Sequence, residues 1–394
     1  MDLSEKFYNF QFPRKIIFGV DSSRKVGSEA KILGGSRVLL VTDSNLMRIG
    51  VVKDVEDSLL GEGFDVEVFS DVEAEPSIEL AEAVAEAARA DRYDLVVGVG
   101  GGSVLDIAKI ASISVTNPGP IRKYVGVNLL VRPGIPKILM PTTAGTGSEV
   151  TNVAVVTLLD EETKSAIISP YMLSDVAIVD PKLTYSMPPR ITASTGLDAL
   201  SHAVEALMAV NSNPISNGLA LQSIEIIVRH LPKSYRVGDE ESRFYMSLGS
   251  MVAGMALSSS GACLGHALAY SFSVTYKIPH GISCGLSLPY AFKFNAPAIR
   301  HRIPQIAWAM GIDPKGRSLE ELEEAVFIRL LTLLDELNVP KRLIDLGVQR
   351  NDVERIARKL LTFTRLIQRN PRIISEDDAR NLVMEMWSGP DNIP

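Results

Sequence analysis

One short segment of the sequence places a carboxylate and an imidazole one helical turn apart in apolar surroundings. Asp198 and His202 lie four residues apart within residues 196–205, so in a helix they share one face, with about 5–6 Å between their Cβ atoms. His266 and His280 follow in uncharged surroundings. Because Pro279 disfavours a continuous helix between these two histidines, we expect His280 to lie on a separate turn that folds back.

These four residues have the chemistry of a metal site. One aspartate and three histidines that converge inside a helical bundle would offer oxygen and nitrogen ligands to a divalent cation such as Fe²⁺ or Zn²⁺. Taken singly, each of them is more often a hydrogen-bonded residue of the core. Three of only five histidines nevertheless fall in the apolar part of the chain with this aspartate, and this favours a shared cation.

Two glycine-rich loops have the chemistry of phosphate binding. Residues 100–103 follow an apolar strand and open a helix that carries Asp106, which we count among the predicted cofactor-binding residues. Glycines let the backbone approach a phosphate, and a helix N-terminus presents unpaired N–H groups to it. Residues 141–149 form a second such loop after another strand. A tight turn would explain either loop alone, but two at the carboxyl edge of one sheet favour a dinucleotide site.

Asp43 ends the first strongly apolar strand. A carboxylate there could accept hydrogen bonds from the adenosine ribose, which would favour NAD(H) over the 2′-phosphorylated NADP(H). Alternatively, Asp43 is the N-cap of a helix that begins at Ser44. Both interpretations remain open from the sequence, and we favour the ribose contact.

The element pattern changes along the chain. Short apolar segments alternate with helical ones through the first half, residues 10–19 form an interrupted edge strand, and residues 153–168 form a hairpin. After Pro188-Pro189 nearly everything is helical. We therefore expect an α/β dinucleotide-binding domain with a doubly wound, mostly parallel sheet at residues 1–188, and an all-helical, metal-binding catalytic domain at residues 189–394. The expected strands of the parallel sheet are residues 37–43, 64–69, 95–99, 137–140 and 175–180.

The net charge and the composition of the chain argue against several classes of function. The net charge of −7 and the lack of any basic run give no support to nucleic-acid binding. Residues 244–276 are almost uncharged, but their many small residues fit two closely packed buried helices better than a membrane span. No signal peptide is indicated, so we expect a cytoplasmic protein. The two cysteines, Cys263 and Cys284, are expected to be reduced and to act only in packing.

With these motifs in view, the sequence resembles the iron-containing (group III) alcohol dehydrogenases from end to end. The resemblance rests on residues 100–109, 141–149, 196–205, 279–281 and 370–372. It implies an active site in the cleft between the two domains, a homodimer, and metal ligands at Asp198, His202, His266 and His280. It implies cofactor contacts at Asp43, Gly101, Gly102, Ser103, Thr142, Thr143, Thr146, Thr151 and Lys164.

The sequence departs from the family pattern at two positions. Many members have a second histidine four residues after the third ligand, where it helps to relay a proton near the nicotinamide, but this chain has Tyr270. A tyrosine there resembles the hydroxyacid–oxoacid transhydrogenase branch, although the ring could equally serve only in packing. Glu75 stands where the family often has asparagine, and this makes the preference for NAD(H) less secure.

The resemblance implies a metal-dependent, NAD(H)-linked alcohol dehydrogenase or aldehyde reductase. It would transfer hydride reversibly between a small primary alcohol or diol and the nicotinamide. Within the same superfamily, the alternatives are a hydroxyacid–oxoacid transhydrogenase and a polyol dehydrogenase of the glycerol type. An alternative of another class is a regulator that binds metal and nucleotide without turnover. The presence of all four ligands together with both glycine loops argues against that regulator.

Overall fold

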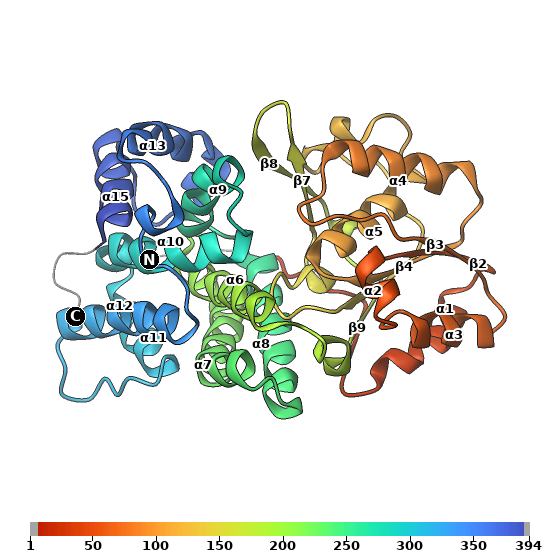
Figure 1. The fold of residues 1–394 in the computed structure, drawn as a ribbon, viewed down its shortest axis with the longest axis horizontal. Coiled ribbons are helices and arrows are strands. Elements are labelled where there is room, and N and C mark those ends of the chain that lie inside the picture. Colours follow the sequence, from red (N-terminus) through yellow and green to blue (C-terminus); the bar gives the residue numbers. More distant parts are fainter. Residues whose placement is uncertain (1–6, 390–394) are drawn as a thin grey trace.

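The computed structural model describes residues 7–389, and a six-stranded parallel sheet forms the core of its N-terminal part (Figure 1). The strand order is β1-β9-β6-β4-β2-β3. Burial on both faces explains why the strands are continuously apolar, as β4 shows along its whole length. All the strands expected for this sheet are present, and the segment at residues 10–19 contributes a shorter edge strand. Their bounds are β1 Lys15–Phe18, β2 Arg37–Val41, β3 Asp65–Phe69, β4 Leu95–Gly100, β6 Lys137–Pro141 and β9 Val176–Val179.

Helices cover both faces of this sheet, which confirms the doubly wound arrangement. Alternate residues of β2 point to opposite sides: Val38 and Leu40 join one apolar cluster, and Leu39 and Val41 join another. One pair of helices covers the first side and a second pair covers the other (Figure 1). These helices are α1 Val26–Leu33 and α3 Lys53–Gly61 on one side, and α4 Ile78–Ala90 and α5 Gly102–Ser114 on the other; α2 Ser44–Arg48 follows β2.

A small second sheet lies beside the helical part of the molecule. Its strands are β7 (Val153–Leu158) and β8 (Thr163–Ile168), which form the expected antiparallel hairpin, with the short β5 (Gly126–Val127) parallel to β8. The tip of the hairpin contacts the other half of the chain, where Lys359 Nζ donates to the carbonyl oxygen of Glu162 at 2.8 Å. The hairpin therefore bridges the two halves.

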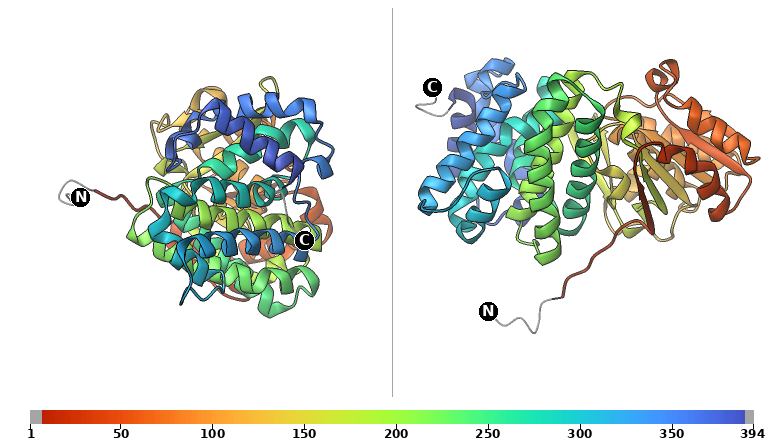
Figure 2. Two further views of the ribbon diagram at one scale, coloured as in Figure 1. Left: turned by 90° about the vertical axis from the view of Figure 1, so that its left-hand side faces the viewer. Right: turned by 90° about the horizontal axis from the view of Figure 1, so that it is seen from below.

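The C-terminal half is helical throughout the residues that the structure describes (Figure 2). Strand β9 ends at Val179 and the first long helix begins at Pro189, while the division at residue 188 into two domains stays a prediction. Helix α6 is central, since α7, α8 and α10 all pack against it. The helices are α6 Pro189–Met208, α7 Pro214–Arg236, α8 Glu240–Ser260, α9 Leu264–Tyr276, α10 His280–Asn295, α11 Ile303–Ala309, α12 Leu319–Glu336, α13 Val353–Thr362, α14 Thr364–Arg369 and α15 Glu376–Ser388.

The uncharged segment at residues 244–276 forms most of α8 and all of α9. Within residues 7–389 no single helix has the length and apolarity to cross a membrane; α8 and α9 meet those criteria only jointly, with a bend of 105° between them. Gly261 makes this bend at a φ of 83°, a backbone conformation that favours glycine. The bend brings the start of α9 back against α6.

Candidate active site

Helix α6 presents three ionisable side chains along one face. Asp198, His202 and Glu205 occupy positions i, i+4 and i+7 and are all buried. The second glycine loop packs on the same helix one turn earlier, where a Cβ on Gly145 would lie 2.6 Å from Cβ of Thr195. The strand-and-loop half of the molecule therefore meets the helical half beside Asp198.

His266 and His280 approach this face from two other helices. His266 lies in the first turn of α9, whereas His280 is the first residue of α10. The chain reverses between them at Lys277, which has a φ of 52°, and Pro279 caps α10, so His280 lies on a separate turn as expected. Gly281 allows α10 to begin against α6, because a Cβ there would overlap the backbone of Ser194.

The imidazoles converge on one carboxylate oxygen. The distance from Asp198 Oδ1 to Nε2 is 3.6 Å for His202, 3.7 Å for His266 and 3.5 Å for His280. Both Asp198 Oδ1 and His266 Nε2 are buried without a hydrogen-bond partner. Such unpaired buried atoms are costly unless a further group joins them.

A divalent cation fits this arrangement. Ligand atoms at about 2.0–2.2 Å around one tetrahedral ion lie about 3.3–3.6 Å apart, close to the separations between Asp198 Oδ1 and the three nitrogens. Burial lowers the pKa of His202 and of His280, which keeps both imidazoles neutral and able to bind a metal. Burial would raise the pKa of Asp198, but the surrounding histidines outweigh it and hold that pKa well below its usual range.

Glu205 orients one of these imidazoles, a role that the sequence analysis missed. Its Oε1 lies 2.5 Å from His266 Nδ1, and its Oε2 accepts the backbone N–H of Cys263 at 2.7 Å. A carboxylate on Nδ1 holds a proton there and fixes the ring so that Nε2 faces Asp198. The signal was present in the sequence, because Glu205 follows His202 by three residues on the same helical face.

Cys284 is a second residue that the sequence analysis did not assign to the site. It lies one turn after His280 on α10, and its Sγ is 3.5 Å from His280 Nε2. Donor atoms of Asp198, His266, His280 and Cys284 all lie within 4.8 Å of one another. Burial raises the pKa of the Cys284 thiol to about 12, so without a cation the sulfur stays protonated. The expectation that this cysteine only packs is therefore incomplete.

The two glycine loops lie side by side, as expected for neighbouring strands. Gly100 at the end of β4 pairs with Pro141 at the end of β6, and Thr142 N donates to the Gly100 carbonyl oxygen at 3.0 Å. The structure thus brings together most of the predicted cofactor-binding residues at one edge of the sheet. They are Gly101, Gly102 and Ser103 from the first loop, and Thr142, Thr143 and Thr146 from the second.

A buried polar cluster fastens the second loop to α5. Lys109 Nζ donates to Ser148 Oγ at 2.7 Å and to Thr151 Oγ1 at 3.3 Å. Both carboxylate oxygens of Asp106 accept from protein groups, one from Ser148 Oγ at 2.5 Å and the other from Val155 N at 2.9 Å. Any contribution of Asp106 to cofactor binding is therefore indirect, through the position of this loop.

Asp43 caps a helix, which was the alternative considered from the sequence. Its Oδ1 accepts the backbone N–H groups of Asn45 at 3.0 Å and Leu46 at 2.9 Å at the start of α2. The same carboxylate lies at the carboxyl end of β2, next to the strand that carries the first glycine loop. A contact between its other oxygen and a ribose stays a prediction.

Comparison with known proteins shows to which family the chain belongs. One family model, described as iron-containing alcohol dehydrogenase, matches residues 13–181, and a second, for the C-terminal part of the Fe-containing alcohol dehydrogenase family, matches residues 192–387. The chain belongs to the iron-containing alcohol dehydrogenase family. It is therefore an oxidoreductase, and the resemblance stated from its motifs is confirmed.

Relatives of this alcohol dehydrogenase are similar along nearly its whole length. It is 40% identical to long-chain-alcohol dehydrogenase 1 of Geobacillus thermodenitrificans over 92% of both chains. A crystal structure of a 1,3-propanediol oxidoreductase superposes with a TM-score of 0.93 at 32% identity, over 97% of this chain and all of the other. The crystal structure of a sulfoacetaldehyde reductase from Bifidobacterium kashiwanohense in complex with NAD⁺ gives a TM-score of 0.87 at 29% identity, over 98% of this chain and all of the other.

Tyr270 of this alcohol dehydrogenase lies directly on the metal-ligand cluster. Its ring stacks on His280 with 5.2 Å between centroids and meets His266 edge-on at 6.1 Å. Burial raises the pKa of Tyr270 to about 12, whereas the charges of His266 and Arg365 act in the opposite direction. The phenol is therefore protonated at neutral pH.

Glu75, the second departure from the family pattern, pairs with Lys164. The Glu75 carboxylate lies 3.0 Å from Lys164 Nζ, and this ammonium lies over the Tyr270 ring at 5.8 Å from its centroid. Lys164 stands on β8 and Tyr270 on α9, so the pair lies where the two halves of the alcohol dehydrogenase meet. Glu75 thus neutralises a cation close to the active site.

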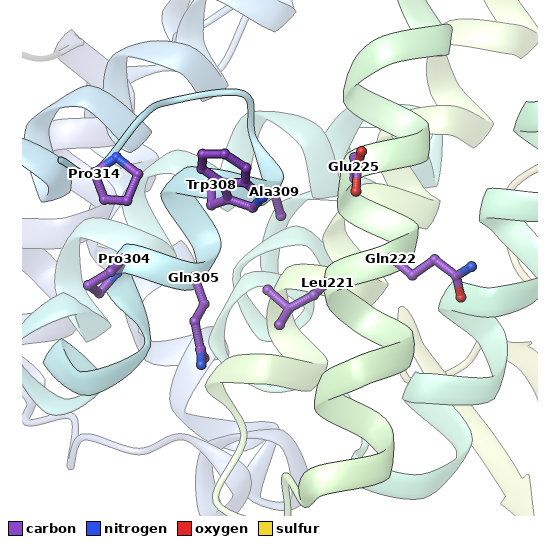
Figure 3. A pocket seen from close by; sticks show the side chains of 8 residues that line it. All are labelled: Leu221, Gln222, Glu225, Pro304, Gln305, Trp308, Ala309 and Pro314. Atoms are coloured by element: carbon purple, nitrogen blue, oxygen red, sulfur yellow. The ribbon is translucent and has the colours of Figure 1, made fainter.

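A surface groove between α7 and α11 lies away from this site (Figure 3). Leu221, Gln305 and Trp308 are among the residues that line it, and none of the predicted site residues does. The groove is therefore separate from the histidine cluster and from the two glycine loops.

Proposed function

We propose that the chain catalyses reversible hydride transfer between a small primary alcohol or diol and NAD(H), with Fe²⁺ as the metal and Zn²⁺ as a substitute. The observation that carries this proposal is the approach of three Nε2 atoms to within 3.5–3.7 Å of Asp198 Oδ1. Within this group, Asp198 Oδ1 and His266 Nε2 are buried without a hydrogen-bond partner. We further propose a cytoplasmic homodimer, as the family resemblance implies.

Asp198, His202, His266 and His280 would hold the cation. When bound, it supplies Lewis-acid stabilisation of the negative charge that develops on the substrate oxygen. The surrounding side chains position the metal ligands and exclude water from them. Glu205 fixes the orientation of His266, and the stacked ring of Tyr270 covers the imidazole of His280.

The two glycine loops and Asp43 would hold the dinucleotide. The N-terminus of α5 offers free backbone N–H groups to the pyrophosphate, and both loops lie at the carboxyl edge of the sheet. Asp43 at the end of β2 would accept the ribose hydroxyls and repel a 2′-phosphate, which supports NAD(H) over NADP(H).

The decisive experiment is a panel of aldehydes and oxo acids assayed with NADH and with NADPH, on protein reconstituted anaerobically with Fe²⁺. We expect reduction of small aldehydes with NADH. Reduction of glycerol-type carbonyls alone would favour a polyol dehydrogenase, and turnover only with a second hydroxy acid would favour a transhydrogenase. No NADH oxidation with any substrate would favour a regulator without turnover.

Replacing Tyr270 with phenylalanine tests whether its hydroxyl moves a proton. We expect a slower proton-dependent step, within about a 10²-fold loss, because general acid–base groups contribute about 10²–10⁴-fold and water can partly substitute. The measurement is the pH dependence of kcat for wild type and variant. A profile that the substitution leaves unchanged would restrict Tyr270 to packing.

Replacing Cys284 with serine tests whether its sulfur influences the choice of metal. Thiolate is a softer ligand than imidazole or carboxylate and favours Zn²⁺. After anaerobic incubation of the apoprotein with equal Fe²⁺ and Zn²⁺, we expect a lower ratio of bound zinc to iron in Cys284→Ser than in wild type. Cys263→Ser is the matched control, since Cys263 is buried outside the donor cluster. Equal metal ratios in all three proteins would leave Cys284 a packing residue.

A further inference from the structure

Two half-buried arginines on α14 have no counter-ion among residues 7–389. Other partly or fully buried arginines of this protein donate to protein oxygens: Arg243 to Thr192 Oγ1 and Met187 O, and Arg89 to carbonyls such as Gly119 O. For Arg365 and Arg369, no carboxylate of residues 7–389 lies near enough to form an ion pair or to influence the guanidinium. Burial lowers the pKa of both groups.

Both arginines face the neighbourhood of the active site. They are four residues apart, so they lie on one face of α14, which packs on the helix that carries His266 and Tyr270. The charge of Arg365 acts on the Tyr270 hydroxyl, and Phe363 at the start of α14 lies 5.7 Å from the Tyr270 ring. Arg369 lies against Gly261, where a Cβ would overlap its guanidinium.

The charges around Tyr270 do not balance. Lys164, whose ammonium lies 5.8 Å from the centre of the Tyr270 ring, is neutralised by Glu75 at 3.0 Å. Arg365 and Arg369, by contrast, form no ion pair with any other part of residues 7–389, and they repel each other. Both guanidinium groups are half-buried and keep contact with water, and a divalent ion at the histidines would add to the positive potential around them. This potential would attract an anionic group that enters the region.

We propose that Arg365, supported by Arg369, binds an oxyanion at the far end of the substrate, so that the physiological substrate is a short aldehyde or alcohol with a carboxylate or sulfonate tail. The guanidinium presents two parallel N–H donors that match such a group. This proposal rests on the proposed function, because it places the reacting carbon of the substrate at the histidine cluster. It makes Arg365 a determinant of specificity, while the histidines remain the site of the reaction.

The test compares charged and uncharged aldehydes of similar length on the metal-loaded enzyme. Wild type, Arg365→Gln, Arg365→Lys and Arg369→Gln are assayed with succinate semialdehyde and with pentanal. Sulfoacetaldehyde and propanal repeat the comparison for a sulfonate. Arg358→Gln is the matched control, because Arg358 is an exposed arginine on the neighbouring α13.

We expect wild type to favour the anionic aldehydes, and Arg365→Gln to lower kcat/KM for them by about 10–100-fold, mainly through KM, since a hydrogen bond to a charged group is of that magnitude. Activity on pentanal should change less than about threefold, Arg365→Lys should recover part of the loss, and Arg358→Gln should behave as wild type. Equal losses for charged and uncharged aldehydes would overturn the proposal. A weakened affinity for NADH with unchanged substrate preference would also overturn it, because the anion would then be the cofactor phosphates.

A binding measurement separates this proposal from the proposed function. Succinate should raise the thermal midpoint of wild type but not that of Arg365→Gln, and this readout needs no turnover. If no aldehyde were reduced but succinate still distinguished the two proteins, the proposed function would fail and the anion site would stand. If succinate stabilised both proteins equally, or neither, the anion site would fail.

Discussion

Asp198→Ala is expected to lose its metal and to lower kcat/KM by about 10³-fold or more, with the fold retained. The Nε2 atoms of His202, His266 and His280 all lie 3.5–3.7 Å from Asp198 Oδ1. The substitution therefore removes the carboxylate oxygen on which the three imidazoles converge. A cation contributes several kcal/mol of transition-state stabilisation, and each 1.36 kcal/mol is a factor of ten in rate. His280→Ala should behave similarly.

The measurement is metal content together with steady-state kinetics, and circular dichroism reports the fold. Ser201→Ala is the matched control on the same helix, since the Ser201 hydroxyl is buried and bonds only to Leu197 O within α6. We expect this control to keep both metal and activity. Full turnover by a metal-free His280→Ala protein would contradict the role that we assign to the cation.

Glu205→Ala is expected to weaken metal binding by about 10–100-fold although Glu205 lies outside the proposed ligand set. Groups that orient a ligating histidine have effects of this size. The substitution leaves His266 Nδ1 and the Cys263 backbone N–H without their acceptor, so we also expect a loss of about 1–3 kcal/mol of stability. Chelator titrations that follow bound metal give the first quantity, and denaturant unfolding of the apoprotein gives the second.

The conservative variant Glu205→Gln distinguishes orientation from simple packing. Its amide oxygen can still accept from Nδ1, but without charge, and its amide nitrogen cannot accept the Cys263 N–H. We expect metal affinity between those of wild type and Glu205→Ala. Wild-type affinity in both variants would show that His266 is held by its surroundings alone.

Much of this arrangement could be predicted because its signals are local. Asp198 and His202 share a face through their spacing alone, Pro279 separates His280 from the preceding helix, and the continuously apolar strands indicate a sheet buried on both sides. Such features depend on a few neighbouring residues and on helix or strand geometry.

What could not be predicted depends on contacts between distant segments. Cys284 lies one turn after His280, but its approach to Asp198 and His266 depends on how α10 packs against α6 and α9. Asp106 points into a cluster closed by Ser148 and Val155, which lie more than forty positions along the chain. That Arg365 has no counter-ion in the described part of the chain is a property of its tertiary surroundings, and residue spacing does not predict it.

The proposed ligands come from three helices, α6, α9 and α10, which apolar clusters of their own hold together. Folding and metal binding are then separable, because apolar packing positions the ligands without requiring the metal ion. The apoprotein should remain folded when dialysis removes the metal ion, and it should bind the ion again when the ion is added back. Enzyme activity would then depend on the supply of free transition-metal ions as well as on the amount of protein.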